Sequence, residues 1–536
     1  MSERVIVAKF GGTSVANAAQ LRKISTIIRS NPERRFIVVS APGKRFPEDI
    51  KVTDLLLTCY EKAIAGEPFK DELEQIRLRY REIIEGLQMV FPLNEEISVL
   101  ERSLQTEPDR DYTASRGEYL TAKIMAQYLG FTFVDPAWCV CFNEDGQLNS
   151  AMTGRTMRAS LLPLNRAVIA GFYGADMTGR IRTFERGGSD ITGSLAACAV
   201  NADLYENWTD VSGLYAANPA IVESPETVPY MSYRELRTLS YMGASVLHSD
   251  AVLSASELEI PINIRNTNQP ENAGTMIMRH LPSGVTKNPV TGVSGRKGMS
   301  VIQIEKVMVS DGSGFSALML DILKERSLPF EYCLTGIDSI TLVIRSDLLE
   351  SCKDELFAEI RDTLNPDFIG LRDRQSLIAV TGEKATEVSD ANVRVLERLT
   401  EEGIEISTIN QGAGKLNLLI GVRRKGTKMP SGRSTTSARL FPPLRARRNK
   451  SRQADPKPAP FTITIDPFTM SPAQACARIL VRGFFNYLLP FSAPELLPGL
   501  PAYFILLPSS FFRPGLSHTP LIPLNRGLRG YAQKHL

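Results

Sequence analysis

The 536-residue sequence has few of the side chains that build metal or redox centres. It contains seven cysteines and four histidines, and no two cysteines form a C-x-x-C pair. The common zinc and thiol–disulfide motifs are therefore excluded, and we predict no resident metal site. Cys139 and Cys141 are interpreted as core thiols of a reduced, intracellular protein.

Long apolar runs are also missing. The amino-terminal stretch, MSERVIVAKF, lacks the apolar core of a signal peptide. The candidate membrane span near the carboxyl end is interrupted by charged residues and prolines, among them Arg482, Pro490, Pro494 and Glu495. We therefore expect a cytoplasmic protein that does not contact a membrane.

Two common nucleotide-binding patterns are absent as well. Gly11 and Gly12 follow a strand-like run, but no Gly-Lys-Ser/Thr comes after them at the spacing of a P-loop. Beyond residue 422, no strand is followed by the G-x-G-x-x-G fingerprint of a dinucleotide-binding domain. The sequence therefore disfavours a P-loop protein and a fused dehydrogenase.

Charge and proline content divide the chain near Val422. Residues 423–536 contain 18 Lys and Arg but three acidic residues, a net charge of +15, and 16 of the 33 prolines. Residues 1–422 contain 44 basic and 56 acidic residues, a net charge of −12. With 43% apolar and 23% charged residues overall, the chain is long enough for two to four globular domains.

The first 290 residues alternate strand-like and helix-like patterns. The strand-like runs are RFIVVSA, FTFVDP, RAVIAGFYG and ADLYENW, and the helix-like stretches are Thr53 to Ala65 and Gly117 to Leu129. This alternation predicts an α/β domain with a mainly parallel sheet between helix layers. Ligands are then expected at the carboxyl ends of the strands.

Two similar βαββ patterns follow, over residues 301–345 and 377–422. Their similarity predicts duplicated small modules. The expected domains are 1–290, 299–375 and a shortened 376–422, followed by an irregular tail over 423–536.

The turn from Lys9 to Ser14 has the composition of a phosphate site. It joins a buried strand to a helix whose apolar face includes Val15, Leu21 and Ile24. Glycines let backbone amides approach a ligand, the helix presents its positive end, and the lysine adds a full charge.

Two further segments carry charged groups at predicted helix starts. Ser115 to Glu118 (SRGE) is expected to open a helix with a carboxylate in its first turn. Arg186 precedes two glycines and then Ser189 and Asp190, which are expected at another helix start. The arginine can grip a carboxylate or phosphate with two hydrogen bonds, and the simpler interpretation of Asp190 is a helix N-cap.

Two other segments are interpreted as loop or cap residues. The stretch NWTDVSGLY places Asp210 and Tyr215 on a loop after a strand, where the acid can face Mg²⁺ or ribose and the aromatic ring a base. Thr53 lies at a helix amino terminus, where its simplest role is that of a cap.

In this order the segments resemble aspartate kinase, a member of the amino-acid kinase family. The similarity runs from Val5 to Val422 through KFGGTSV, VVSAPGKRF, KVTDLL, SRGE, GFYGADMTGRIRTFERGGSDITGSL, NADLYENWTDVSGLY and ELRTLSYMGASVLH. The resemblance implies that ATP with Mg²⁺ phosphorylates L-aspartate to 4-phospho-L-aspartate. This reaction begins lysine, threonine, methionine and diaminopimelate synthesis.

The resemblance also implies a role for each matching residue. The implied catalytic residues are Lys9, which neutralises the transferred phosphoryl group, and Asp190, which orients Lys9. The implied aspartate-binding residues are Thr53, Glu118, Arg186 and Ser189, and the implied nucleotide-binding residues are Gly11, Gly12, Thr209, Asp210 and Tyr215. The substrate carboxylate is itself the nucleophile, so no general base is needed, and His248 is interpreted as structural.

The tandem βαββ units are similar to ACT modules, which in this family bind a feedback amino acid, lysine or threonine. The expected binding turn at a helix start contains Asp311, Ser313, Gly314, Phe315 and Ser316. A glycine-rich connection is the alternative interpretation of this turn. The resemblance implies a homodimer or higher homo-oligomer formed through the modules.

Two positions depart from the family pattern. Ala220 stands where the family usually has an arginine after Asp-Pro, and Ser245 stands where many members have a lysine. Loss of a charged phosphate contact weakens nucleotide binding by about 1.5–3 kcal/mol. A catalytically impaired amino-acid sensor is therefore the alternative function.

The tail from Arg423 cannot form the acidic-to-apolar helix that closes the second module in relatives. Its codons from Arg423 to Thr436, read two nucleotides out of register, can encode EEGDEDAVRAIYD, which has the character of that helix. We hypothesise that residues 423–536 arise from a shifted reading frame. A nucleic-acid-binding tail is disfavoured because its positive charge is concentrated before residue 458, so no nucleic-acid partner is expected.

Overall fold

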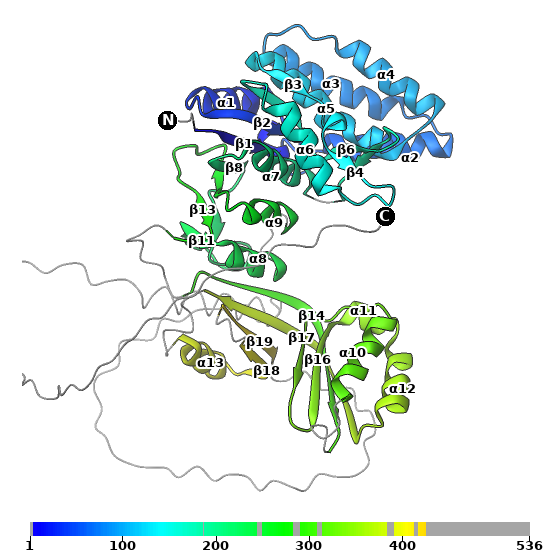
Figure 1. The fold of residues 1–536 in the computed structure, drawn as a ribbon, viewed down its shortest axis with the longest axis vertical. Coiled ribbons are helices and arrows are strands. Elements are labelled where there is room, and N and C mark those ends of the chain that lie inside the picture. Colours follow the sequence, from blue (N-terminus) through cyan, green and yellow to red (C-terminus); the bar gives the residue numbers. More distant parts are fainter. Residues whose placement is uncertain are drawn as a thin grey trace, which may run out of the picture. The chain divides into compact units, whose positions relative to one another are not determined.

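A computed structural model of the protein describes residues 4–185, 187–243, 249–281, 290–307, 314–382, 391–411 and 416–424 (Figure 1). The expectations for Arg186, Ser245, His248, Asp311 and Ser313 lie outside these described residues. The tail from residue 425 onward, with its reading-frame hypothesis, also lies outside them.

An eight-stranded sheet forms the centre of the amino-terminal domain. Its strand order is β11-β13-β12-β8-β1-β2-β5-β3. The strands are β1 (Ile6–Phe10), β2 (Arg34–Val39), β3 (Thr132–Val134), β5 (Ala167–Ala170), β8 (Leu204–Thr209), β11 (Tyr230–Ser232), β12 (Ile262–Asn266) and β13 (Thr275–Met278). β1 pairs in parallel with β2 and β8, whereas β13 pairs antiparallel with β12, which confirms the mainly parallel sheet.

Helices cover both faces of this sheet, as predicted (Figure 1). One layer contains α1 (Ala18–Arg29), α2 (Val52–Ala65), α3 (Lys70–Gly86), α4 (Leu93–Thr106) and α5 (Arg110–Leu129). The other contains α6 (Ser150–Leu161), α7 (Gly188–Val200), α8 (Tyr233–Tyr241) and α9 (Ser249–Glu257). Alternate residues of β1 enter the two cores, with Val7 in one and Ala8 in the other.

The order of the sheet reverses at β1. The chain passes from β1 to β2 and outward on one side, then returns to β8 on the other side of β1. In open α/β sheets, ligands bind at such a reversal, beyond the carboxyl ends of the strands. The topology therefore predicts a ligand site among the residues that follow β1 and β8.

Short strands lie outside the main sheet. They are β4 (Cys141–Phe142), β6 (Tyr173–Asp176) and β7 (Ile181–Thr183) in one sheet, and β9 (Leu214–Tyr215) with β10 (Thr227–Val228) in another. The run RAVIAGFYG is therefore two strands of different sheets, β5 and β6, and not one. Phe172 lies between them with φ of 80°, so the chain turns sharply there.

Residues 292–424 contain one six-stranded sheet in the order β15-β16-β14-β17-β19-β18. Its elements are β14 (Gly292–Glu305), α10 (Phe315–Glu325), β15 (Tyr332–Thr335), β16 (Ser339–Arg345), α11 (Ser346–Glu350), α12 (Lys353–Leu364), β17 (Phe368–Thr381), α13 (Ala391–Glu401), β18 (Ile404–Gln411) and β19 (Asn417–Arg424). The 14-residue strands β14 and β17 pair antiparallel along their length, so the two βαββ units share a continuous sheet.

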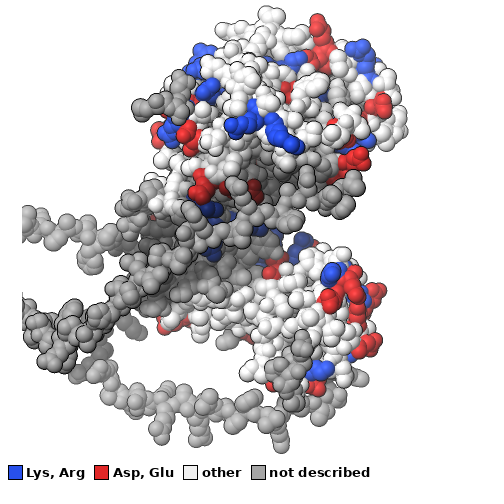
Figure 2. All heavy atoms as spheres, in the orientation of Figure 1, with Lys and Arg blue, Asp and Glu red and all other residues white. Residues whose placement is uncertain are grey.

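The two cysteines, the surface charges and the helices bear on the expected class of protein. Cys139 is buried, as predicted, whereas Cys141 is half-buried with its Sγ 3.6 Å from the Thr156 hydroxyl. Figure 2 shows Lys and Arg interspersed with Asp and Glu over the face in view. Among the described helices, none combines the length and the apolar character needed to cross a bilayer.

Candidate active site

The side chains of Lys9, Asp190 and Asn207 meet between β1, α7 and β8. Lys9 Nζ lies 2.5 Å from Asp190 Oδ1 and 3.5 Å from Asn207 Oδ1, and Asn207 Nδ2 donates to Asp190 Oδ1 at 3.0 Å. The lysine and aspartate side chains have exposed fractions of 9% and 14%. Asp190 and Asn207 therefore fix the lysine cation in a nearly dry position at the carboxyl end of β1.

Asn207 was missed as a site residue in the sequence analysis. It lies directly opposite Lys9 in the parallel pairing of β1 with β8, so both side chains emerge on the same face. The signal that could have identified it is a polar amide next to Glu206 inside the buried strand LYENW.

The glycine turn after β1 is packed backbone against backbone. Gly12 O accepts a hydrogen bond from the amide of Gly43 at 2.8 Å, and a Cβ on Gly43 would lie 2.7 Å from the Gly12 carbonyl carbon. A Cβ on Gly12 would lie 3.1 Å from Ala41 O. A side chain at position 43 would therefore clash with the neighbouring main chain, and one at position 12 would make an unusually close contact with it.

Two features of this turn differ from the expectation. The glycines lead into a 3₁₀ turn, η1 (Gly12–Val15), and α1 begins only at Ala18, with Asn17 as its side-chain cap. The positive end of α1 is thus separated from the glycines. In addition, the Gly11 amide donates to Trp208 O at 3.0 Å, so Gly11 contributes space and not a donor.

The start of α7 brings Ser189 and Asp190 to the site, but the N-cap interpretation of Asp190 is wrong. Gly187 occupies the cap position with φ of 63°, which glycine adopts without strain, and Asp190 is the third helical residue. Its carboxylate is free to pair with Lys9 because the cap does not require it. Ser189 packs against Gly171, where a Cβ would lie 2.5 Å from the Ser189 hydroxyl.

Glu118 is a buried carboxylate with an unpartnered oxygen. It is 5% exposed, burial raises its pKa to about 8, and its Oε2 has no hydrogen-bond partner. Its expected position in a first helical turn is wrong, because α5 already begins at Arg110 and Glu118 lies in its interior. A backbone hydrogen bond from Ala41 links it to the segment that contacts Gly12. Such a carboxylate is suited to receive a cation.

Thr53 is not a helix cap. The cap of α2 is Lys51, without a side-chain hydrogen bond, and Thr53 is the second helical residue. Its hydroxyl is half-buried, and no hydrogen bond to it occurs within the described ranges. The hydroxyl is therefore available to a ligand.

The candidate nucleotide loop begins at the end of β8. Thr209 is the last residue of the strand, and its hydroxyl donates to the exposed Asp210 carboxylate at 3.2 Å. Tyr215, expected on a loop, instead lies in β9, where it pairs with Thr227 of β10. The pairing fixes the main chain of this half-buried residue.

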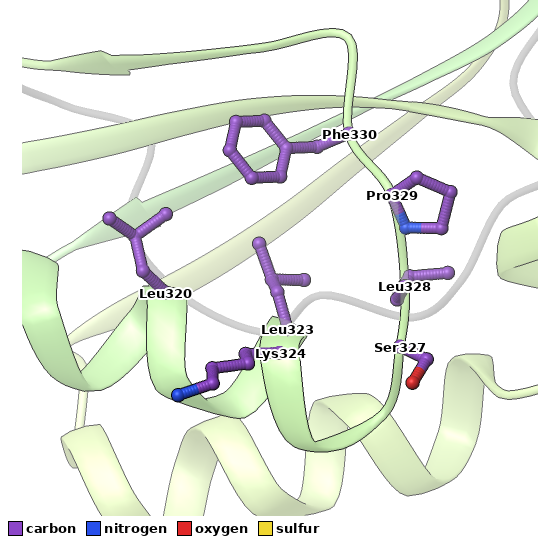
Figure 3. Close-up of a pocket in the computed structure, with 7 residues that line it drawn as sticks. All are labelled: Leu320, Leu323, Lys324, Ser327, Leu328, Pro329 and Phe330. Carbon is purple, nitrogen blue, oxygen red and sulfur yellow. The ribbon is translucent and has the colours of Figure 1, made fainter. Parts of the chain in front are cut away.

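The expected effector turn is described from Gly314 onward. Gly314 precedes α10, Ser316 is half-buried, and Phe315 is 8% exposed in a core with Met319 and Ile322. The Phe315 side chain therefore serves the module's core. A groove of about 460 Å³ lies at the opposite end of α10 (Figure 3), lined by Leu320, Leu323, Lys324, Ser327, Leu328, Pro329 and Phe330.

The chain is similar in sequence and fold to known proteins. The sequence profile of the amino acid kinase family matches residues 4–266. Aspartokinase 3 of Bacillus subtilis is 34% identical over 432 residues, which span 78% of this chain and 95% of that protein. The crystal structure of Clostridium acetobutylicum aspartate kinase, described as an allosteric enzyme, has a TM-score of 0.70 at 39% identity and spans 78% and 96% of the two chains.

Escherichia coli aspartokinase III is similar in two crystal structures. Its complex with lysine and aspartate (T-state) has a TM-score of 0.58 at 25% identity and covers 78% of this chain and 95% of that chain. Its complex with aspartate and ADP (R-state) has a TM-score of 0.62 at 24% identity, with 78% and 96% covered, and shares the fold.

Proposed function

This chain belongs to the aspartokinases of the amino acid kinase family, and from that premise we propose how its residues transfer the γ-phosphoryl group of ATP to L-aspartate. The acceptor is the side-chain carboxylate, and the products are 4-phospho-L-aspartate and ADP. The observation that carries the proposal is the buried ion pair of Lys9 with Asp190 at the reversal point of the sheet.

Lys9 stabilises the negative charge of the phosphoryl group while it is transferred. Phosphoryl transfer asks for positioning and charge stabilisation, with little covalent chemistry from the protein. A cation held at 2.5 Å by Asp190 needs no reorganisation during the reaction, and its burial strengthens its field. Gly11 leaves room for the phosphates beside it, since a Cβ there would lie 3.6 Å from Lys9 Nζ.

The aspartate pocket combines groups from three helices. Glu118 of α5 receives the substrate ammonium, Arg186 binds its α-carboxylate, and Thr53 and Ser189 complete the pocket. The unpartnered oxygen of Glu118 supports this assignment, because a substrate cation would satisfy it.

The nucleotide enters as its magnesium complex. Magnesium is usually held by one or two carboxylates together with substrate phosphates, and the exposed carboxylate of Asp210 has that chemistry. Thr209 orients Asp210, and Tyr215 packs against the base.

The chain assembles into homo-oligomers through its six-stranded sheet.

Feedback by lysine or threonine reaches the nucleotide loop through β14 of that sheet. The amide of Val293 in β14 donates to Ala216 O at 2.7 Å, next to Tyr215. The hydroxyl of Thr291 donates to Glu235 of α8 at 2.6 Å. An effector that shifts β14 therefore shifts the residue beside Tyr215.

A coupled ADP-release assay tests the proposed function. ADP release that depends on both ATP and L-aspartate supports the kinase, whereas D-aspartate and L-glutamate serve as matched non-substrates. Well-folded protein that binds an effector amino acid but gives no aspartate-dependent ADP would favour a catalytically impaired amino-acid sensor. Ala220, in place of the arginine usual in the family, is the residue that suggests this alternative.

A further inference from the structure

The end of β12 connects the two segments that form the proposed nucleotide site. β12 pairs in parallel with β8, so that Asn266 lies opposite Thr209. The glycine turn follows β1 and the nucleotide loop follows β8, and these two segments are about two hundred residues apart in sequence. Thr267 contacts both of them, and Arg265 and Asn266 contact β8 and the loop after it.

Thr267 bonds to both segments at once. Its amide donates to Thr209 O at 2.9 Å, and its hydroxyl shares a 2.8 Å hydrogen bond with the hydroxyl of Ser14 in η1. Thr267 is 1% exposed and Ser14 is 2% exposed. The hydrogen bond between the hydroxyls is therefore dry, and loss of one partner leaves the other unsatisfied.

The neighbours of Thr267 contact β8 and the loop that follows it. Asn266 Nδ2 donates to Ser212 Oγ at 2.9 Å, within the nucleotide loop. The Arg265 guanidinium lies over the Trp208 ring at 4.6 Å, and Trp208 O accepts the Gly11 amide. Arg265 and Asn266 thus fix the end of β12 against β8, and Thr267 extends this contact to the glycine turn through Ser14.

We propose that Thr267 is a positioning residue for the nucleotide. Its hydroxyl holds η1, and through it the glycine turn beside Lys9, in register with Thr209 and Asp210. This inference rests on the proposed function, because it takes these two segments as the nucleotide site. Thr53 and Glu118, two of the proposed aspartate-binding residues, come from α2 and α5 and not from the two segments that Thr267 bonds to, so we expect aspartate binding to depend less on this hydroxyl than nucleotide binding does.

Thr267→Val tests the proposal, because it removes the hydroxyl and keeps the backbone bond to Thr209. The net worth of one buried neutral hydrogen bond predicts a rise of about five- to tenfold in the KM for ATP and in the Kd for MgADP. The KM for aspartate is expected to stay within about twofold. Thr267→Ser restores the hydroxyl and should recover nucleotide binding.

Thr153→Val is the matched control. Thr153 is 0% exposed, and its hydroxyl accepts from the Cys141 amide at 2.9 Å, away from the glycine turn. It should lose stability without weakening MgADP binding. If Thr267→Val does not fold, Ser14→Ala removes the other hydroxyl of the pair and should weaken MgADP binding in the same way.

Calorimetric titration with MgADP separates the possible outcomes. Unchanged MgADP affinity in Thr267→Val, or an equal rise in both KM values, would overturn the positioning role. A loss of MgADP affinity confined to Thr267→Val and Ser14→Ala supports it, even if the wild-type chain shows no aspartate-dependent turnover. Absence of aspartate-dependent turnover in the wild type would overturn the proposed function but not the positioning role. A wild-type chain that binds no MgADP would overturn both the proposed function and the positioning role.

Discussion

Lowering the pH from 8 to 6 is expected to raise the KM for aspartate about fiftyfold. Burial raises the pKa of Glu118 to about 8, against the opposing effects of the Ala41 backbone hydrogen bond and the Arg116 charge. The substrate ammonium binds the ionised form, which is about half the population at pH 8 and about 1% at pH 6. The apparent affinity falls in proportion to that fraction.

The assay measures the KM for aspartate at saturating ATP in steps between pH 6 and pH 8.5. Glu118→Gln keeps the shape of the side chain without its ionisation, so its KM should be high and independent of pH. Glu72→Gln is the matched control, because Glu72 pairs with Lys62 on a neighbouring helix and its pKa is lowered. This control should keep the wild-type profile.

A wild-type KM that is flat over this range would refute the role of Glu118, as would a profile that persists in Glu118→Gln. Stability provides a second check. A carboxyl with a raised folded-state pKa contributes stability that is present below its ordinary value of 4.5 and is lost as the pH rises through about 8. Glu118→Gln should therefore lose less stability than the wild type across that interval.

Three other predictions concern charge and the carboxyl end. Lys9→Ala should lower kcat by about 10³-fold with the fold intact by circular dichroism, since its charge stabilises the transition state; a kcat near that of the wild type would end this assignment. Ala220→Arg should lower the KM for ATP, as the exposed position can return a cation to the phosphates, and an unchanged KM would mean that the alanine is neutral here. Resequencing the codons for Val422 and Arg423 should reveal a shifted frame, whereas an intact frame with a protease-resistant 423–536 fragment would refute that hypothesis.

The sheet and its helix layers could be predicted because their signals are local. Apolar runs identify β1, β2, β5 and β8, and their alternation with helices requires a mainly parallel sheet. Helix starts were harder to predict. Asp109 caps α5 through the Tyr112 amide, eight residues before Gly117, where the helix-like sequence pattern begins.

The contacts of the site depend on long-range pairing that composition does not encode. Lys9 and Asp190 are separated by 181 residues, and Asn207 faces them because of the register of β1 with β8. Thr267 carried no motif, and its position follows only from the pairing of β12 with β8. Likewise, the shared sheet arises because β14 and β17 are longer than a single unit requires.

Trapping of the product with hydroxylamine tests whether the chain transfers the phosphoryl group to the side-chain carboxylate of aspartate. An acyl phosphate reacts with hydroxylamine to give a hydroxamate, whereas transfer to water gives only ADP and phosphate. We expect aspartyl hydroxamate in amounts equal to the ADP released, and its loss in Lys9→Ala. ADP release without hydroxamate, from folded protein with ATP and L-aspartate, would contradict it.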